Sequence, residues 1–380
     1  MASQWHQSKL VRVGAVLLAL LLVVLLALPY LLDIDRYRPA ITDALKKQTG
    51  REVEIESLRL HFLPSLRVSV SNVRLKNPKG FPDGDTVTIG SIDVGLAFRP
   101  LLSGQVEITS VTLGAIEVNL LTDARGRTNY ASLLNPPRSS RKKAAAAEEE
   151  TSWSLARVDS VALEDITITS GTFRRRNKRV YPMWAATGIN VRAQGFDFTS
   201  NNWREKMTAR IDLTPIKFTS PSLKEPLRFT DGEVEVKGNA ARGNLTAALG
   251  PLRAQGSVRM ANLAKPVAVF TLSMKELDVA SLRQVLGPGP EGEPKPPGGR
   301  SGQGLLARGT VKVGRVIVSP LSAEKVDAKV RIYADRLEVN PFSFSFYRGA
   351  AKGTLGVKLD DQALPARVNA TVQGVEVARL

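Results

Sequence analysis

Beyond Gly50, most of the chain alternates apolar and polar residues with a period of two. The clearest run is KVDAKVRIYA (325–334), whose apolar face would consist of Val326, Ala328, Val330, Ile332 and Ala334. Such alternation is typical of an antiparallel strand with one dry and one solvated face. RLEVNPFSFSFY (336–347) and ARVNATVQGVEVA (366–378) alternate similarly. Counting these runs gives roughly sixteen strands and few helices, which predicts a mainly β fold.

A six-residue pattern recurs along these strands: apolar, any, small or polar, apolar, any, apolar. Its copies are IESLRL (55–60), VSNVRL (70–75), IGSIDV (89–94), ITSVTL (108–113), VDSVAL (158–163), VGRVIV (313–318) and VQGVEV (372–377). A step of two residues keeps a side chain on one face of a strand, whereas a step of three moves it to the other face. The pattern therefore predicts a change of face through a β-bulge or a sharp bend, and repeated bends curl a sheet into a trough.

So loose a pattern also arises by chance in alternating strands. However, ITSVTLGAIEV (108–118) matches VDSVALEDITI (158–168) along its whole length, which favours true internal repetition. We therefore expect an elongated, curved antiparallel β-sheet that forms an open, taco-like groove.

The first apolar stretch, VGAVLLALLLVVLLALPYLL (13–32), carries no charge and has about the 20 residues that a helix needs to cross a bilayer. Lys9 and Arg12 precede it, which favours a cytoplasmic N-terminus. A cleaved signal peptide is the alternative, but its apolar core is usually shorter and is followed by a small-x-small cleavage site. We expect residues 1–33 to form a cytoplasmic tip and one transmembrane anchor, with the remaining chain outside the cytoplasm.

A short amphipathic helix is expected between the anchor and the first strand. Ile34, Tyr37, Ile41 and Leu45 follow one another at spacings of three and four, and Gly50 provides a stop signal. The helix would lie on the membrane surface or plug one end of the sheet, or it would simply pack on its own domain. Either kind of burial satisfies a single apolar stripe.

Two segments of linker composition divide the strands. NPPRSSRKKAAAAEEETS (135–152) is rich in Pro, then basic, then rich in Ala, then acidic, and GPGPEGEPKPPGGRSGQG (287–304) is mostly Pro and Gly. Besides the anchor they predict five units: a helix and β section at 34–134, a middle β section at 153–286, a C-terminal β section at 305–380, and the two linkers at 135–152 and 287–304.

The composition excludes most catalytic chemistry. The chain has no Cys, and its two histidines are His6 and His61. A serine nucleophile or an imidazole-based metal site would depend on His61, which alternates within RLHFLPS as an ordinary strand residue. No Walker A loop and no G-x-G-x-x-G between a strand and a helix occurs in the sequence. We therefore expect no enzyme, no catalytic residue, no metal site and no cofactor.

The formal net charge is +17, which in a cytoplasmic protein would favour nucleic-acid binding. The expected location outside the cytoplasm and the scarcity of aromatic residues argue against a nucleic-acid partner. The densest basic cluster, FRRRNKR (173–179), has the composition of a hairpin turn. It would contact anionic lipid headgroups, or it would be an ordinary solvated turn, which the cluster taken alone slightly favours.

Three stretches resemble the AsmA family of bacterial envelope proteins, which includes TamB-like members. They are the anchor followed by IDRYRPAITDALKKQTGREVEIESLRL (34–60), FRPLLSGQVEITSVTLGAIEVNLLTDARGRTNYASLL (98–134), and the distal group LDVASLRQVLG (277–287), GTVKVGRVIVSPL (309–321) and LEVNPFSFSFYRGAAKGTLGVKL (337–359). The most specific parts are P-L-L-x-G-x-V-x-I at the start and D-x-x-G-x-x-N at the end of the second stretch.

The resemblance implies a curved β-sheet with a hydrophobic inner groove, like that of bridge-type lipid transfer proteins. It also implies a role in moving phospholipids toward the outer membrane or in outer-membrane assembly, and it supplies no catalytic residues. Family members usually continue beyond VQGVEVARL (372–380), so the chain would be a C-terminally truncated or a short member.

These observations predict an inner-membrane-anchored periplasmic protein that shields lipid acyl chains in its groove and supports phospholipid transport and outer-membrane biogenesis. The candidate groove residues are Val326, Val330, Ile332, Phe342, Phe344 and Phe346. The same residues could instead fill a closed sandwich core. The alternative function is a non-catalytic scaffold for outer-membrane protein assembly, in which a sheet edge recruits a partner strand without lipid. Expected partners are the inner membrane through residues 13–32, phospholipids, and envelope or outer-membrane assembly proteins.

Overall fold

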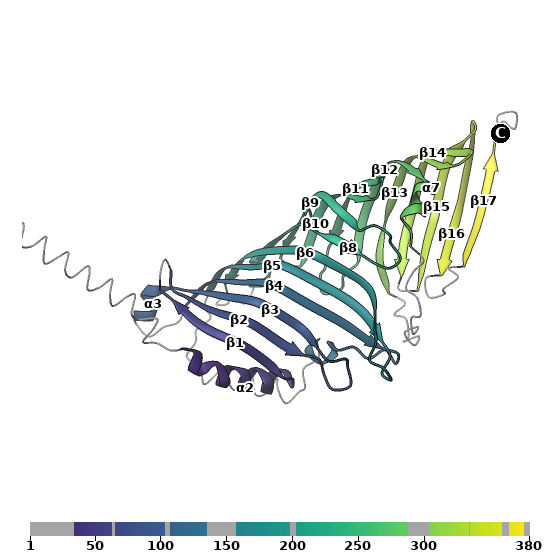
Figure 1. Ribbon diagram of the computed structural model, residues 1–380. Coiled ribbons are helices and arrows are strands. Elements are labelled where there is room, and N and C mark those ends of the chain that lie inside the picture. Colours follow the sequence, from purple (N-terminus) through teal and green to yellow (C-terminus); the bar gives the residue numbers. More distant parts are fainter. Residues whose placement is uncertain are drawn as a thin grey trace, which may run out of the picture.

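The computed structural model describes residues 34–62, 65–102, 107–134, 157–197, 203–287, 304–333, 335–358 and 365–375. Within them, a single sheet of 17 strands makes up nearly the whole protein (Figure 1). The strands are β1 (Val53–His61), β2 (Arg67–Lys76), β3 (Asp85–Leu96), β4 (Ile108–Asp123), β5 (Arg157–Phe173), β6 (Val180–Asp197), β7 (Thr208–Asp212), β8 (Lys217–Thr219), β9 (Leu227–Lys237), β10 (Ala240–Leu249), β11 (Leu252–Met260), β12 (Ala268–Asp278), β13 (Leu305–Val318), β14 (Leu321–Tyr333), β15 (Arg336–Phe346), β16 (Gly349–Lys358) and β17 (Ala366–Gln373). The helices are η1 (Ile34–Tyr37), α2 (Arg38–Thr49), α3 (Phe98–Leu102), α4 (Ala131–Leu134), α6 (Trp203–Lys206) and α7 (Val279–Val285). The predicted mainly β fold is confirmed.

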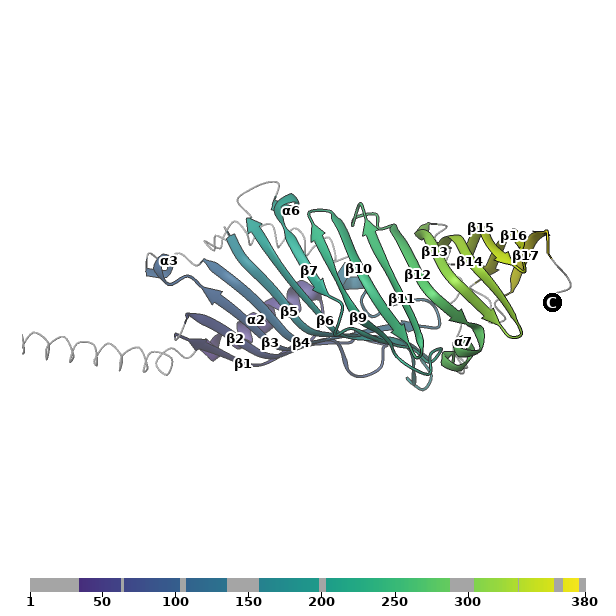
Figure 2. The same cartoon turned by 90° about the horizontal axis from the view of Figure 1, so that it is seen from above.

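The strands lie side by side in chain order, from β1 at one end of an arched sheet to β17 at the other (Figures 1 and 2). β7 and β8 are two short strands that share one position in the sheet, between β6 and β9, because each of them pairs with both neighbours. Neighbouring strands are antiparallel at every described pairing except β4–β5 and β12–β13, which are parallel. The prediction of a uniformly antiparallel sheet is therefore wrong at these two positions.

The two parallel pairs follow from the length of their connections. A tight turn reverses the chain, whereas a parallel neighbour requires a longer connection that returns to the starting edge of the sheet. Residues 124–156, including α4, connect β4 to β5, and residues 279–304, including α7, connect β12 to β13. The predicted linkers 135–152 and 287–304 fall in these connections and lie almost entirely outside the described residues. The division into sections at these linkers therefore stays a prediction.

The parallel β4–β5 pair accounts for the repeated sequence. Residues of β4 face residues fifty positions later in β5, as in the pairs Ser110–Ser160, Leu113–Leu163 and Val118–Ile168. ITSVTLGAIEV and VDSVALEDITI consequently lie next to each other in register, and directly opposed side chains share a face of the sheet. The internal repeat thus places each residue of β4 opposite the corresponding repeat residue of β5.

The predicted change of face at the step of three residues does not occur. Val53, Ile55 and Leu58 of β1 belong to one buried cluster, although a step of three separates Ile55 from Leu58. Val70 and Val73 of β2, which also stand three residues apart, both pack against that cluster. The apolar side chains on the two sides of each step therefore remain on one face of the sheet, and this part of the prediction is wrong.

The reason is a bend at which each strand omits one residue from the ladder. Between β1 and β2 the pairing passes over Asn72, whose φ is 48°. Ala115 of β4 and Asp165 of β5, each with φ of 50°, are passed over together in the same way. A left-handed residue turns the backbone out of the extended path, so the side-chain alternation restarts beyond it. At these positions the predicted sharp bend is therefore present without an extra residue. In ITSVTL, by contrast, Leu96 pairs with Ile108 and Gly95 with Ser110, so Thr109 is the extra residue of a predicted β-bulge.

The short helix covers one end of the sheet. Gly50, with φ of 68°, ends α2 as predicted. Ile34 and Leu45 of the predicted stripe pack against the apolar residues of β1 and β2, while Tyr37 is 52% and Ile41 38% exposed. Seen from above, the strands lie in front of α2, so the helix occupies the underside of the arch (Figure 2). Part of the stripe thus packs on the protein's own sheet.

No helix within the described ranges is both long enough and apolar enough to span a bilayer. The expected anchor at residues 13–32 and the cytoplasmic tip before it lie outside those ranges, so both stay predictions.

Candidate functional site

The strand pairing traces a continuous apolar face, because directly opposed residues on neighbouring strands point to the same side of a sheet. One row of opposed residues, the central row, crosses the whole sheet without a polar side chain. It consists of Leu58, Val70, Ile92, Leu113, Leu163, Val191, Ile211, Val234, Gly243, Val258, Phe270, Gly309, Val330, Val339, Leu355 and Val368. The apolar surface therefore extends from β1 to β17.

A second row beside it is equally apolar. It starts at Leu60 of β1, passes through Val161 of β5, Val236 of β9 and Ala307 of β13, and ends at Ala366 of β17. Both rows lie on the face against which α2 packs, since Leu58 and Val70 belong to the cluster that receives Leu45. The apolar face is therefore the underside of the arch.

The opposite face is charged. Its row between the two apolar rows consists of Arg59, Ser69, Asp93, Thr112, Ala162, Arg192, Arg210, Glu235, Arg242, Arg259, Val269, Arg308, Arg331, Glu338, Gly356 and Arg367. Arg242 and Glu235 form an ion pair at 2.8 Å, which lowers the pKa of Glu235 below its ordinary value through the hydrogen bond and charge of Arg242. One side of the sheet is thus suited to water and the other to apolar matter.

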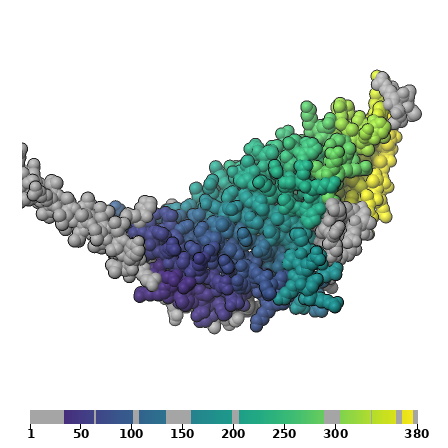
Figure 3. Space-filling view, viewed as in Figure 1, coloured from purple at the N-terminus to yellow at the C-terminus, as the bar shows by residue number. Residues whose placement is uncertain are grey.

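Among the residues that the structure describes, the apolar face is open over most of its length. A sandwich core requires a second sheet packed about 10 Å away, and all 17 described strands belong to one sheet. Most side chains of the central row are half-buried, and Val368 is 58% exposed. Figure 3 shows a long body drawn out in the direction in which the strands succeed one another. The described strands form a trough and leave the sandwich alternative without a second layer.

All six predicted groove residues lie on this face. Val330 is part of the central row and Ile332 of the second row, while Val326 faces Val313. On β15, the ring centroid of Phe344 lies 6.1 Å from that of Phe342 and 6.5 Å from that of Phe346.

Small residues of β16 stand opposite these three rings: Gly353, Ala351 and Gly349. A Cβ atom on Gly353 would come within 2.6 Å of Phe342, so the ring lies across the glycine. The structure brings the six residues together, and their contact with lipid stays a prediction.

Sequence reasoning missed most of this face. On β14 and β15 the alternation of apolar and polar residues is regular enough to predict which side chains share a face. On other strands the bends interrupt this alternation, so the sequence does not show which apolar residues lie on the same face. It also missed Trp184 and Phe218, whose stacked rings lie 6.0 Å apart near the edge of the trough. The signal that could have found them is the apolar step of three, once it is understood as a bend that preserves the face.

The family model of the AsmA family matches residues 7–271. The chain belongs to the AsmA family. The match includes the first two stretches that carry the resemblance, and the distal stretch lies beyond it, so that part stays a prediction. No curated protein matches the chain in sequence. AsmA family proteins are associated with the bacterial envelope, which is consistent with an envelope role for this member.

The D-x-x-G-x-x-N motif of this AsmA member closes the end of β4. The buried Asp123 carboxylate accepts hydrogen bonds from the backbone N–H groups of Arg125 and Arg127, both at 2.9 Å, and from Arg127 Nε at 2.8 Å. Burial by itself raises the pKa of Asp123, but the hydrogen bonds from Arg127 and Arg125 outweigh it, so the pKa lies below its ordinary value. Gly126, with φ of 77°, completes the turn.

Asn129, the last residue of the motif, joins three segments of the AsmA sheet. Its amide is fully buried and donates to Asn77 Oδ1 at 2.9 Å and to the Asn119 carbonyl at 2.7 Å. Its side-chain oxygen accepts the N–H of Leu121 at 2.9 Å. Arg51 donates to the Asn129 carbonyl and, at 3.0 Å, to Thr86.

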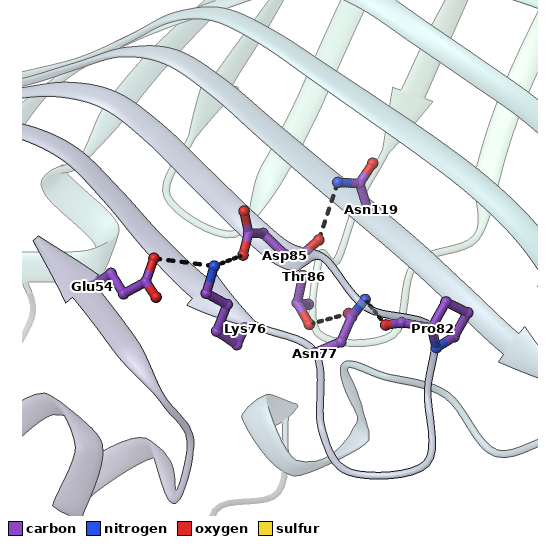
Figure 4. Close-up of polar contacts among 7 residues, drawn as sticks. All are labelled: Glu54, Lys76, Asn77, Pro82, Asp85, Thr86 and Asn119. Atoms are coloured by element: carbon purple, nitrogen blue, oxygen red, sulfur yellow. Dashed lines mark hydrogen bonds and ion pairs between the residues drawn. The ribbon is translucent and has the colours of Figure 1, made fainter. Parts of the chain in front are cut away.

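Figure 4 shows the part of this network around Asn77 and Thr86, whose hydroxyl donates to Asn77 Oδ1 at 2.8 Å. In the same view Lys76 Nζ lies 3.0 Å from the Glu54 carboxylate and 3.1 Å from that of Asp85. Hydrogen bonds to Glu54 and Asp85 raise the pKa of Lys76. Apart from Arg51 Nε, for which the described residues provide no hydrogen-bond partner, these polar groups are paired with one another and stabilise the edge of the trough. Across the described ranges, no three His, Asp or Glu residues gather as a metal ion would require.

Proposed function

We propose that this AsmA-family chain is an inner-membrane-anchored periplasmic protein that shields phospholipid acyl chains on its apolar face and supports phospholipid transport and outer-membrane biogenesis. The observation that carries the proposal is the continuity of the two apolar rows from β1 to β17 on a sheet with one open face. The chain's role is non-catalytic in this account.

Acyl chains suit this surface energetically. Removing one CH₂ group from water is worth about 0.8 kcal/mol, so contact with many ordinary apolar side chains can hold a lipid without a single decisive residue. A polar group in the path would impose a cost of roughly 1–3 kcal/mol if left without a hydrogen-bond partner. Since the central row has no polar side chain, a lipid could move from strand to strand without meeting such a barrier.

The position of α2 supports loading at the β1 end. The helix directly follows the predicted anchor and is tied to β1, where Asp35 accepts the N–H of Leu58 at 2.9 Å and Arg38 donates to the Glu56 carbonyl at 2.6 Å. Tyr37 and Ile41 are exposed, so their side chains are available to contact a membrane surface. A lipid leaving the inner membrane would meet this end of the trough first.

A scaffold function is the second candidate, and the edge of β17 favours it. β17 pairs with β16 alone among the described strands, and its Val368 and Val372 are 58% and 54% exposed. An exposed edge of this kind can accept a strand from another protein. In that account the apolar face would receive protein rather than lipid.

Site-specific photo-crosslinking of the full-length chain in an expressing host separates these functions. A crosslinking residue at Val330 or Phe344 should capture phospholipid, because both side chains lie on the apolar face. Lys329 is the matched control, since it faces Thr310 on the charged side and is exposed. Capture of protein only at Val330 and Phe344 would favour the scaffold and contradict the lipid function.

A further inference from the structure

The β5–β6 hairpin carries the densest positive charge of the chain at one edge of the trough. Its tip, which we call the basic hairpin, consists of residues 174–179 and contains Arg174, Arg175, Arg176, Lys178 and Arg179. All of these side chains are exposed. The sequence left two interpretations open, a contact for anionic headgroups or an ordinary solvated turn.

The basic hairpin is held firmly at its base. Phe173 is fully buried and its ring centroid lies 5.0 Å from that of Phe81, in a cluster that also contains Leu121. Lys178 Nζ lies 3.1 Å from the carboxylate of Asp83 in the neighbouring loop. The charges of the hairpin are therefore presented at a fixed place relative to the trough.

Aromatic rings lie between the basic hairpin and the apolar rows. Ile168 of β5 faces Ala186 of β6, and toward the hairpin the next β6 side chains on the same face are Trp184 and Tyr181. The register shifts by one residue at Met183, which places both rings on the apolar face although three positions separate them. The guanidinium groups of Arg174 and Arg179 lie 5.9 and 5.4 Å from the Tyr181 ring centroid.

The surface therefore changes from aliphatic to aromatic to basic within one pair of strands. The same order of chemistry occurs at the boundary of a bilayer, where aromatic rings lie at the level between acyl chains and headgroups. A phospholipid lying along β5 and β6 would place its acyl chains beside Ile168, its ester region beside Trp184 and Tyr181, and its phosphate beside the basic hairpin.

We propose that the basic hairpin binds the headgroup phosphate of anionic phospholipids whose acyl chains lie on the apolar face beside it. This inference rests on the proposed function and adds a preference for one class of lipid. A zwitterionic headgroup carries its own cation next to the phosphate, whereas an anionic headgroup brings a net charge that the hairpin attracts. Of the nearby carboxylates, Asp83 is paired with Lys178 of the hairpin and Asp123 with Arg127. The four arginines of the basic hairpin keep this edge positive.

The test places a photo-crosslinking residue at Trp184 in the full-length chain and identifies the captured lipids by mass spectrometry. We expect the anionic share of the captured lipid to exceed the anionic share of the host membrane. The triple variant Arg175→Gln/Arg176→Gln/Arg179→Gln should reduce the ratio of anionic to zwitterionic lipid captured at least about fivefold, allowing for partial screening by salt. Replacement of the same three residues by Lys should preserve it, because the attraction depends on charge.

The matched control removes the same number of charges from the other face, as Arg308→Gln/Lys329→Gln/Arg331→Gln. An enrichment that survives in the hairpin variant, or that falls equally in the control, would overturn the proposal. An effect of added inorganic phosphate, at constant ionic strength, as large as that of the hairpin variant would assign the hairpin to free phosphate instead.

The outcomes also separate this inference from the proposed function. Capture of lipid at both Trp184 and Val330 without anionic enrichment would refute the headgroup preference and leave the lipid trough intact. Absence of lipid at both positions would refute the proposed function itself.

Discussion

Ala115 has a backbone conformation that suits glycine better than a residue with a side chain. Its φ is 50°, its side chain is exposed, and the ladder passes over it. A left-handed residue with a Cβ atom costs about 1–2 kcal/mol. Ala115→Gly should therefore raise the free energy of unfolding by up to about 1 kcal/mol, because the greater freedom of glycine in the unfolded chain offsets part of the gain.

Ala162→Gly is the matched control, since Ala162 lies within a regular part of β5 and has no positive φ. There the same change should lower stability by roughly 0.5–1 kcal/mol. Denaturant unfolding of both variants checks the pair. A loss of stability in Ala115→Gly would contradict the bend.

Asp123 links the stability of the AsmA turn to pH. Its pKa is lower in the folded chain than the ordinary value near 4 expected when unfolded. The carboxylate therefore stabilises the fold fully above that unfolded pKa, and its contribution is lost as the pH falls through the folded pKa.

Asp123→Asn should reduce stability near pH 7, and its deficit relative to the parent chain should shrink below about pH 4. Unfolding measured across pH checks this prediction, with Asp43→Asn as control because Asp43 is exposed on α2. A deficit that stays constant with pH would contradict the role of the charged carboxylate.

At the scale of elements, alternation in the sequence was sufficient to predict strands and a helix, and insufficient to predict how they connect. The β14 and β15 runs and the stop at Gly50 depend on local periodicity and local propensity, which one segment carries by itself. The parallel β4–β5 pair depends on a long connection, and only the matching repeat hinted at it.

The bends were harder to predict because the residue type at the bend only partly determines its backbone conformation. Asn72 and Gly188 favour a positive φ, but Ala115 does not, so the surrounding sheet must impose it there. For the same reason the six groove residues could be predicted from the regularly alternating stretches 326–332 and 342–346, while Trp184 and Tyr181 lie on either side of a register shift.

The packing of α2 on the underside of the sheet can be tested through the apolar residues that it covers. The chain has no Cys, so a single Cys in place of Val70 reports the accessibility of that position. Leu45→Asp should expose it and speed its reaction with a maleimide about tenfold, the effect of roughly 1.4 kcal/mol of lost packing. Lys46→Asp, on an exposed position of the same helix turn, should leave the rate unchanged. Equal rates in both variants would contradict the contact.

At the scale of the whole molecule, the open apolar face is expected to bind an apolar ligand or partner. Soluble proteins rarely expose contiguous apolar patches beyond a few hundred Å², and larger ones mark binding surfaces. Here two apolar rows cross every strand position from β1 to β17, while the other face carries the arginine-rich row. This asymmetry separates an AsmA-type trough from an ordinary β-domain, whose apolar face is filled by its own second layer.

The most direct test interrupts the rows and asks whether lipid still reaches the far end. Val258→Asp/Met260→Asp places two carboxylates on the apolar face of β11, and Gln255→Asp/Ser257→Asp places two on its other face. Crosslinking residues at Ile92 and Val330 report lipid before and beyond the interruption.

We expect the first variant to keep lipid capture at Ile92 and to lose at least about tenfold at Val330, since an unpaired carboxylate in the apolar path is strongly unfavourable. The second variant should capture lipid at both positions like the parent chain. Undiminished capture at Val330 in the first variant would contradict movement of lipid along the apolar rows.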